Sequence, residues 1–307
     1  MAAARTRFGR TLAAMANPTR NMQHAIVRES RRGNEVESGP DASTWLAEAP
    51  RGAYTTARTV RSRAVFEFEA HVERLVASAK AMEAPPEAAI NMEQRLRDAM
   101  ASAVHAFERN NPGNDGEVRL TALLTWEGNE NELLCHAGPL PPRPKQPVKV
   151  LVRGEPRSNA KAKDSEWVRD RKPLEDSKPK DVNEVILEGE DGSLYEGLSS
   201  NFFVVQDGTL YTAGKNILEG TVRLLTLEVC RKHGIPVKLE APNIRDLEKW
   251  DGALISSTSR LLLPVMDLSA PDLDPPVHRT FAEDSMVFQL EELVLREIEA
   301  HSTPILP

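Results

Sequence analysis

The sequence has little cysteine and no recognisable metal-binding or redox motif. Its two cysteines, Cys135 and Cys230, lie far apart in the 307-residue chain and match no metal or redox spacing. They are most simply free thiols in a reducing compartment, which favours a cytoplasmic location. The seven histidines include no HExxH motif, so a protein-bound zinc site is not expected.

Long apolar runs and an excess of positive charge are also absent. No stretch approaches the roughly 20 apolar residues that cross a bilayer, and a net charge of −7 is not typical of a nucleic-acid-binding protein. The motifs GxGxxG after a strand and GxxxxGK[ST] do not occur, and there is no GxSxG motif. We therefore expect neither a nucleic acid nor a membrane as a partner.

The first 33 residues differ from the rest of the chain in composition. They carry seven arginines, no lysine and a single acid, Glu29. An Arg-rich, acid-poor segment is typical of an organelle transit peptide, although the usual serine enrichment is missing. The alternative is a basic arm or an ordinary first helix. We expect this segment to lie outside the folded domains, and a transit peptide would place the protein in a mitochondrion or plastid.

Residues 34–137 have the pattern of a small α/β domain. Apolar residues recur at helical spacing between Glu69 and Met82, which predicts a helix there. The other expected elements are a strand over 64–68, a helix over about 86–110, a strand over 118–126 and its partner "ELLCHA". The segment "GPLPPRPKQP" (138–147) contains five prolines. Because proline-rich segments are stiff spacers, we place the domain boundary there.

Residues 148–307 form the expected larger domain. The pair Asp207-Gly208 predicts a tight turn between strands over 201–205 and 209–212. The other expected elements are strands over 148–152, 184–189, 236–241 and 253–257, a helical turn near Leu247, and helices over 164–177, 221–233 and about 285–300. Helices and strands are mixed without strict alternation, so the predicted fold class is α+β.

Four segments of the larger domain carry residues that could form one chemical site. Lys161 and Lys163 stand just before a predicted helix. Glu196 opens the hairpin, where a buried carboxylate requires a partner. In "LEGTVR", a glycine and a threonine begin a helix, and the free amides and dipole of a helix start suit a phosphate. The segment "SSTSR" (256–260) adds a run of hydroxyls after an apolar strand.

A lysine amine, an acid and phosphate-binding turns are what pyridoxal phosphate requires. The lysine forms a Schiff base with the cofactor. A carboxylate near the pyridine nitrogen keeps that nitrogen protonated, which strengthens the ring as an electron sink. Each feature alone also has an ordinary explanation: a solvated lysine, a helix cap or a polar loop.

These segments resemble the class IV, or fold-type IV, pyridoxal phosphate-dependent aminotransferases. That family includes branched-chain aminotransferases, D-amino-acid aminotransferases and aminodeoxychorismate lyase. "EGLSSNFFVVQDGTLYT" resembles its Glu-Gly-x-x-x-Asn-x-Phe hairpin, and "ILEGTVRLLTLEVCRKHGIPV" its Gly-Ile-Thr-Arg helix. "GAYTTARTVRSRAVFEFEAHVERLVASAKAM" looks like its first-domain stretch with His-x-x-Arg-Leu, and "LISSTSRLLLPV" is similar to its last phosphate-site segment. The resemblance implies two domains, the smaller one N-terminal, and a homodimer.

The resemblance assigns the central chemistry to three residues. Lys163 matches the Schiff-base lysine that also moves the substrate Cα proton, with Lys161 as the rival. Glu196 matches the acid at the pyridine nitrogen, so its expected partner is a pyridinium. Arg74 matches the arginine that grips the phosphate; the alternative is a surface arginine on an amphipathic helix.

Four further positions match cofactor contacts of the family. They are Gly220, Thr221, Val222 and Thr258. The family usually has Ile-Thr after the glycine, whereas this chain has Thr221-Val222. The second position therefore lacks a hydroxyl but keeps its amide.

The resemblance also marks a substrate side, formed by Tyr54, Arg119 and Ser259. The arginine that follows the core strand in D-amino-acid aminotransferases has no counterpart, because Leu123–Trp126 occupies that region. The expected function is amino-group transfer between an amino acid and a 2-oxo acid. The alternatives are a lyase of the aminodeoxychorismate type and a protein that binds pyridoxal phosphate without turnover.

Overall fold

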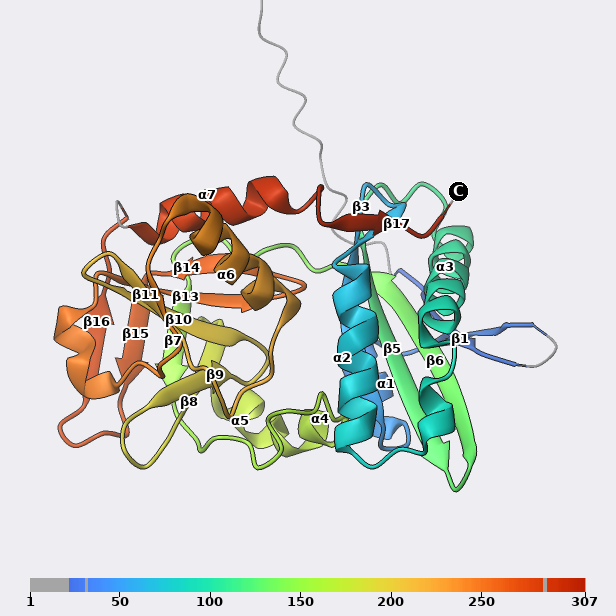
Figure 1. The fold of residues 1–307 in the computed structure, drawn as a ribbon, viewed down its shortest axis with the longest axis horizontal. Coiled ribbons are helices and arrows are strands. Elements are labelled where there is room, and N and C mark those ends of the chain that lie inside the picture. Colours follow the sequence, from blue (N-terminus) through green and yellow to red (C-terminus); the bar gives the residue numbers. More distant parts are fainter. Residues whose placement is uncertain (1–21, 31–32, 284–285, 307) are drawn as a thin grey trace, which may run out of the picture.

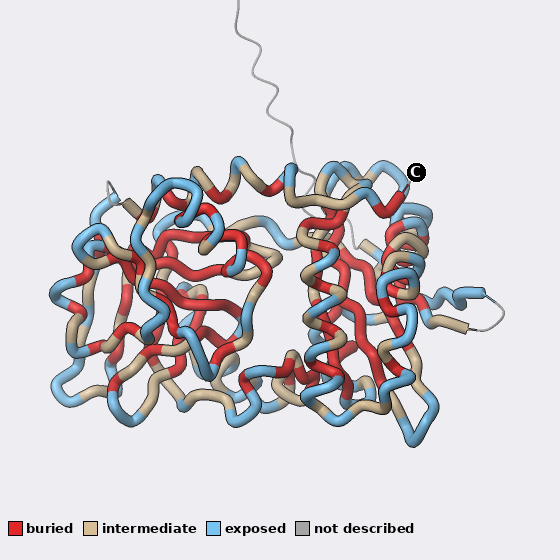
Figure 2. The backbone as a smooth tube through the Cα atoms, viewed as in Figure 1, coloured by how far each residue is buried: buried red, intermediate tan, exposed pale blue. Residues whose placement is uncertain are grey.

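The computed structural model describes residues 22–30, 33–283 and 286–306. These residues build two β-sheets that stand side by side, each with its own helices (Figure 1). Buried residues run along the central strands of both sheets (Figure 2). The protein is therefore an α+β protein, as the sequence predicts.

The first sheet contains strands in the order β17-β4-β3-β5-β6-β1-β2. These strands are β1 (His24–Arg28), β2 (Glu35–Gly39), β3 (Ala53–Val60), β4 (Ala64–Phe66), β5 (Val118–Glu127), β6 (Glu130–Pro139) and β17 (Ser302–Pro304). One face is covered by α2 (Phe68–Ala81), the 3-10 helix η1 (Pro86–Ala89) and α3 (Met92–Asn110), and the other by α1 (Ala42–Glu48). Both faces are used because successive strand side chains point to opposite sides.

The second sheet has the order β12-β11-β10-β9-β8-β7-β15-β16, and a further strand pair joins it through β10 and β13. Its strands are β7 (Lys149–Val152), β8 (Glu184–Glu188), β9 (Leu194–Gly197), β10 (Asn201–Gln206), β11 (Thr209–Tyr211), β12 (Val237–Lys238), β13 (Gly252–Ser257), β14 (Leu261–Val265), β15 (Asp267–Ala270) and β16 (Val277–Thr280). Its helices are α4 (Glu166–Asp170), α5 (Lys172–Ser177), α6 (Thr221–His233), η2 (Ile244–Lys249) and α7 (Met286–Glu297). Parallel and antiparallel pairs are mixed in this sheet.

Two of the predicted helices are interrupted. The helix expected over 86–110 divides into η1 and α3, because Asn91 adopts a left-handed backbone with φ of 53°. The helix expected over 164–177 divides into α4 and α5. Pro173 stands in the first turn of α5, a position that proline tolerates better than a helix interior.

The expected limits of the first domain need correction at both ends of the chain. Strand β1 lies within residues 1–33, which we expected outside the fold, yet it pairs with β6, where Ala25 stands opposite Ala137. Residues 302–304, which we placed in the larger domain without predicting a strand, form β17, and this strand pairs with β4 of the first sheet. Three consecutive buried residues, Ala25–Val27, give β1 a place in the core. This apolar run is too short to stand out from the basic composition around it. Residues 1–21 and 31–32 of the predicted arm lie outside the described residues.

The hairpin that follows Glu196 forms as the sequence predicts. Val204 of β10 pairs with Tyr211 of β11, and Asp207 and Gly208 at the turn have φ of 49° and 67°. Two consecutive positive φ angles define a type I′ turn, whose twist matches that of the strands it joins. The turn therefore fixes the register of β10.

Replacing Gly208 by alanine tests this turn. A Cβ at Gly208 would meet no heavy atom within 4 Å, so the cost of Gly208→Ala comes from the left-handed backbone and should be about 1 kcal/mol of unfolding free energy. Urea denaturation measures it. Gly116→Ala is the control, because that glycine has no left-handed φ and its Cβ would make an ordinary 3.4 Å contact. Equal effects of the two substitutions would contradict the turn.

Candidate active site

A cleft of about 430 Å³ lies where the two halves of the protein meet. This volume is within the range of small-molecule sites. All the predicted site residues line it: Tyr54, Arg74, Arg119, Lys163, Glu196, Gly220, Thr221, Val222, Thr258 and Ser259. The first three come from the sheet and helix of the first half, and the others from the second half, so the cleft exists only because the two halves are joined.

Lys163, and not its rival Lys161, reaches the cleft. Lys161 is exposed and does not line the cleft, whereas the Lys163 ammonium lies 4.6 Å from the centre of the Tyr54 ring. Burial lowers the pKa of Lys163 to about 8, helped by the positive charges of Arg74, Arg171 and Arg157, while Tyr54 acts in the opposite direction. A lysine with such a pKa is partly neutral near physiological pH.

The loop that carries Lys163 is attached to the start of β3. The Lys163 amide donates to Ser78 Oγ at 3.0 Å, and its carbonyl accepts from the Tyr54 amide at 2.9 Å. The next residue, Asp164, forms an ion pair with Arg51 at 2.5 Å. These contacts cross between the two halves, so they set where the lysine stands relative to α2 and β3.

Glu196 is buried, and its partners within the protein are Arg157 and the Leu218 amide. Its Oε1 accepts from Arg157 Nε at 2.8 Å and from Arg157 Nη2 at 2.7 Å, while Oε2 accepts from the Leu218 amide at 3.0 Å. Burial raises the pKa of Glu196, and Arg157 and the Leu218 amide counteract that rise. Arg157 was not among the predicted site residues, because nothing in its local segment distinguishes it from a surface arginine.

Arg74 is directed into the cleft and lacks an ion-pair partner among the described residues. Its Nη2 donates to Thr55 Oγ1 at 2.7 Å and lies 2.9 Å from His71 Nδ1. Burial lowers the pKa of Arg74 to about 10 and holds the pKa of His71 well below its usual value. A neutral His71 can accept from Arg74, which orients the guanidinium. In the described part of the protein, the Nε of Arg74 has no hydrogen-bond partner. This N–H group therefore remains as a donor for an anion.

The start of α6 lies in a corner of the cleft that could bind an anion. We call this corner, lined by Arg74, Thr221, Val222 and Thr258, the anion-binding corner. The first turn of a helix presents amides without intrahelical partners, and here that turn begins with Thr221 and Val222. The Thr221 and Thr258 hydroxyls lie 3.2 Å apart. The missing hydroxyl at Val222 removes one donor, but its backbone amide belongs to the same turn.

Asn201 holds this corner in place, although it was not among the predicted site residues. Its Nδ2 donates to the Leu218 carbonyl at 2.7 Å, and its Oδ1 accepts from the Gly220 amide at 3.1 Å. A Cβ on Gly220 would lie 2.3 Å from Asn201 Oδ1. Glycine is therefore required for this close approach, and the Asn of the Glu-Gly-x-x-x-Asn motif was the available signal.

The three predicted substrate residues line the cleft on the side of the first sheet and the Thr258 turn. Burial lowers the pKa of Arg119, with Asp41 acting against it. Arg119 Nε has no hydrogen-bond partner among the described residues. For Tyr54, burial alone would raise the pKa, but the charges of Lys163, Arg171 and Arg157 together lower it. The whole cleft is thus electrostatically positive.

The described residues offer no grouping of histidine, cysteine, aspartate and glutamate that could hold a metal ion. Across the same ranges, none of the helices combines the length and apolar character needed to cross a bilayer.

The pKa of Lys163 provides a direct test of this electrostatic arrangement. Labelling of Lys163 by an amine-selective reagent, followed by peptide mass spectrometry, should reach half its maximal rate at about pH 8. Because the Arg74 charge lowers the pKa of Lys163, Arg74→Gln should move the midpoint to higher pH. Arg153→Gln, outside the cleft, is the control. An unchanged midpoint in Arg74→Gln would show that the two charges do not interact.

Curated proteins with related sequences include aminotransferases. The D-alanine aminotransferase of Staphylococcus aureus is 32% identical over 113 residues, which are 35% of this chain and 37% of that protein. A D-alanine aminotransferase of Listeria monocytogenes is 38% identical over 69 residues, or 22% of this chain and 24% of that protein. The chain therefore matches well under half the length of these relatives.

Solved structures match over nearly the whole fold. A hypothetical aminotransferase from Mycobacterium tuberculosis, in a PLP-bound form, has a TM-score of 0.70 at 22% identity and covers 90% of this chain and 99% of its own. The branched-chain aminotransferase of Thermoproteus uzoniensis with norvaline has a TM-score of 0.72 at 17% identity, covering 92% and 99%. These identities establish the fold alone. The class IV amino-transferase family matches residues 52–268, most of the chain, and the protein belongs to that family.

Proposed function

We propose that the protein is a pyridoxal phosphate-dependent aminotransferase that moves an amino group between an amino acid and a 2-oxo acid. One observation carries the proposal: a single cleft brings together the Lys163 amine, the buried Glu196 carboxylate and the anion-binding corner at the start of α6. Membership of the class IV family supports the reaction class. The PLP-bound form of the related fold supports the cofactor.

The residues of the cleft fit pyridoxal phosphate. The unpartnered Arg74 Nε, the first-turn amides of α6 and the hydroxyls of Thr221 and Thr258 suit a phosphate. Glu196 is the acid that would hold the pyridine nitrogen, and Lys163 is the amine that would react with the aldehyde. When bound, this cofactor supplies an electron-accepting ring for substrates attached through their amino group.

Lys163 is suited to take up and return a proton. With a pKa of about 8, about one Lys163 side chain in ten is neutral at pH 7. A group that titrates close to the working pH is an effective general base and, once protonated, a general acid. Tyr54, against which the ammonium lies, limits where this amine can point.

Arg119 is the proposed site for a carboxylate of the substrate. It lines the cleft and keeps an unpartnered guanidinium nitrogen among the described residues. Arg58 stands directly opposite it on β3, so the sheet presents two positive side chains at this position. A carboxylate can accept two hydrogen bonds from a guanidinium, which orients it as well as binding it.

The assembly expected from the resemblance is a homodimer, which stays a prediction. Light scattering of the purified protein would test it. The same measurement with and without pyridoxal phosphate would show whether the cofactor affects assembly.

The function is tested by the visible absorbance of the protein purified with pyridoxal phosphate. We expect an absorbance band that depends on the Lys163 amine, is lost in Lys163→Ala and is kept in Lys161→Ala, because Lys161 lies outside the cleft. An amino acid should bleach the band of the unaltered protein, and a 2-oxo acid should restore it. A panel of L- and D-amino acids would identify the substrate.

Three other outcomes would contradict the proposal in different ways. Release of product without any need for an amino acceptor would indicate a lyase. A stable band that no amino acid bleaches would indicate binding without turnover. Absence of any band in folded protein would remove pyridoxal phosphate from the function.

Arg119→Gln tests the substrate side separately. Losing a charge-assisted hydrogen bond, worth about 1.5–3 kcal/mol, should raise KM for the amino acid about tenfold or more. The affinity for pyridoxal phosphate should be unchanged, because the anion-binding corner is built from other residues. Arg58→Gln shows whether the opposite arginine shares this role. An unchanged KM in Arg119→Gln would place the substrate carboxylate elsewhere.

A further inference from the structure

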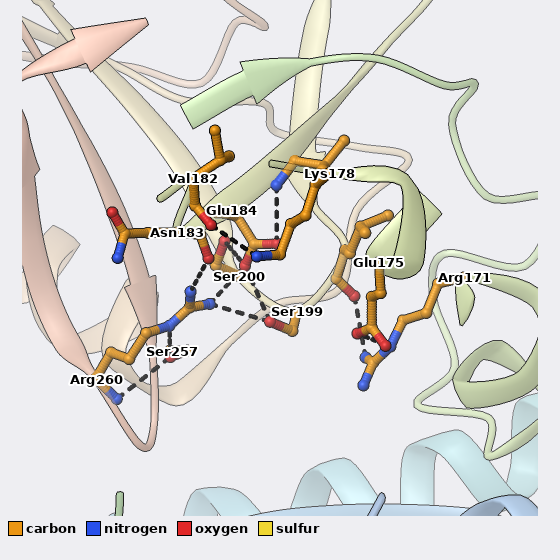
Figure 3. A network of polar contacts seen from close by, with 12 residues as sticks. Arg171, Glu175, Lys178, Val182, Asn183, Glu184, Ser199, Ser200, Ser257 and Arg260 are labelled. Atoms are coloured by element: carbon orange, nitrogen blue, oxygen red, sulfur yellow. Dashed lines mark hydrogen bonds and ion pairs between the residues drawn. The ribbon is translucent and has the colours of Figure 1, made fainter. Parts of the chain in front are cut away.

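Arg260 lines the cleft, but its guanidinium is engaged by protein groups (Figure 3). Its Nη2 lies 2.5 Å from Glu184 Oε2 and donates to Ser199 Oγ at 3.0 Å. Its Nη1 donates to the Asn183 carbonyl at 3.2 Å, and its Nε to Ser257 Oγ at 3.1 Å. All three guanidinium nitrogens therefore have acceptors within the protein, which leaves little capacity for a substrate carboxylate.

Glu184 is the acid at the centre of this network. Its side chain is 4% exposed, and Oε2 also accepts from Ser199 Oγ at 2.9 Å and Ser200 Oγ at 3.0 Å. Burial alone would raise the pKa of Glu184, but Arg260 and the two hydroxyls together lower it. Removing one partner from a buried ion pair leaves the other charge uncompensated. Each of Glu184 and Arg260 therefore holds the other in place.

The Glu184–Arg260 pair joins two segments of the cleft. Arg260 is the last residue of the turn between β13 and β14, which also carries Thr258. The serine partners of Glu184 lie in the loop between β9, which carries Glu196, and β10. Packing is tight here, since a Cβ on Gly197 would lie 2.7 Å from Glu184 Cγ. The pair thus connects the turn that carries Thr258 to the loop that follows Glu196.

We propose that Arg260 is a positioning residue for the anion-binding corner. Through Glu184 and Ser199 it fixes the turn that holds the Thr258 hydroxyl 3.2 Å from that of Thr221. The inference rests on the proposed function, because the anion is taken to be the phosphate of pyridoxal phosphate. Arg260 acts on that phosphate without contacting it.

The test compares two ligands on the full chain: pyridoxal phosphate, and pyridoxal, which lacks the phosphate. Quenching of tryptophan fluorescence reports binding, since Trp167 lines the cleft. Residues that orient a primary ligand typically change affinity by about 10- to 100-fold at metal sites. We expect Arg260→Gln to weaken binding of pyridoxal phosphate about tenfold and to leave binding of pyridoxal nearly unchanged.

Matched variants distinguish a role of Arg260 in positioning the anion-binding corner from a general contribution to the stability of the fold. Glu184→Gln removes the same ion pair from its other side and should reproduce the phosphate-specific loss. Arg153→Gln is the control, because Arg153 also pairs with an acid, Asp272, at 2.6 Å but does not line the cleft. It should leave both affinities unchanged.

Milder variants keep the test valid if loss of the buried pair unfolds the protein, as judged by circular dichroism. Ser199→Ala removes one contact of Arg260 without leaving a charge unpaired. Arg260→Lys keeps the charge but loses the planar fork of donors. Both should weaken pyridoxal phosphate binding less than Arg260→Gln, again without affecting pyridoxal.

Two results would overturn the inference while the unaltered protein still binds pyridoxal phosphate. Equal weakening of both ligands in the folded variants would mean that Arg260 supports the fold in general. Unchanged binding of pyridoxal phosphate would mean that the turn holds its position without Arg260. If the unaltered protein binds neither ligand, the proposed function fails instead, so the two failures are distinguishable.

Discussion

The cleft contains more positive side chains than acids to neutralise them, and its chemistry depends on this imbalance. Three of its arginines are paired with acids: Arg157 with Glu196, Arg171 with Glu175 and Arg260 with Glu184. Arg74, Arg119 and Lys163 line the same cleft without an ion-pair partner among the described residues. Because an unpaired buried charge is costly, the cleft is prepared for anionic ligands. A phosphate bound at Arg74 and a carboxylate bound at Arg119 would compensate these unpaired positive charges.

The same positive field lowers the pKa of Lys163, which suits the proton transfer that we propose for it. Burial accounts for the largest part of its lowered pKa, and the neighbouring arginines add to it. A phosphate bound at Arg74 would offset one of those charges, so the field at Lys163 depends on whether the anion is present. In the proposed function, Arg74 would bind the anion and Lys163 would transfer the proton, so these two roles are electrostatically coupled although the residues lie far apart in the sequence.

The sequence predicted the parts of the site whose signal is local. The turn at Asp207-Gly208 and the bounds of α6 follow from turn chemistry and helical spacing, and both match the structure. The resemblance to family motifs then predicted that distant residues such as Arg74 and Lys163 belong to one site. Arg157 could not be predicted, because its role depends on a contact with Glu196, 39 positions away. Strand β17 was missed for a similar reason, since a three-residue strand is defined by its partner.

The last strand, β17, returns to the first sheet and so gives the two halves a second attachment. Arg74 belongs to α2 of the first half, whereas Glu196 and Thr221 belong to the second, so the shape of the cleft depends on how the two halves are held. The Lys163 loop holds them together on one side through β3. On the other, β17 pairs with β4, and His301 lies 2.8 Å from Glu67, which directly precedes α2. A site assembled from two sheets thus has two attachments, one beside the lysine and one at the start of the helix that carries Arg74.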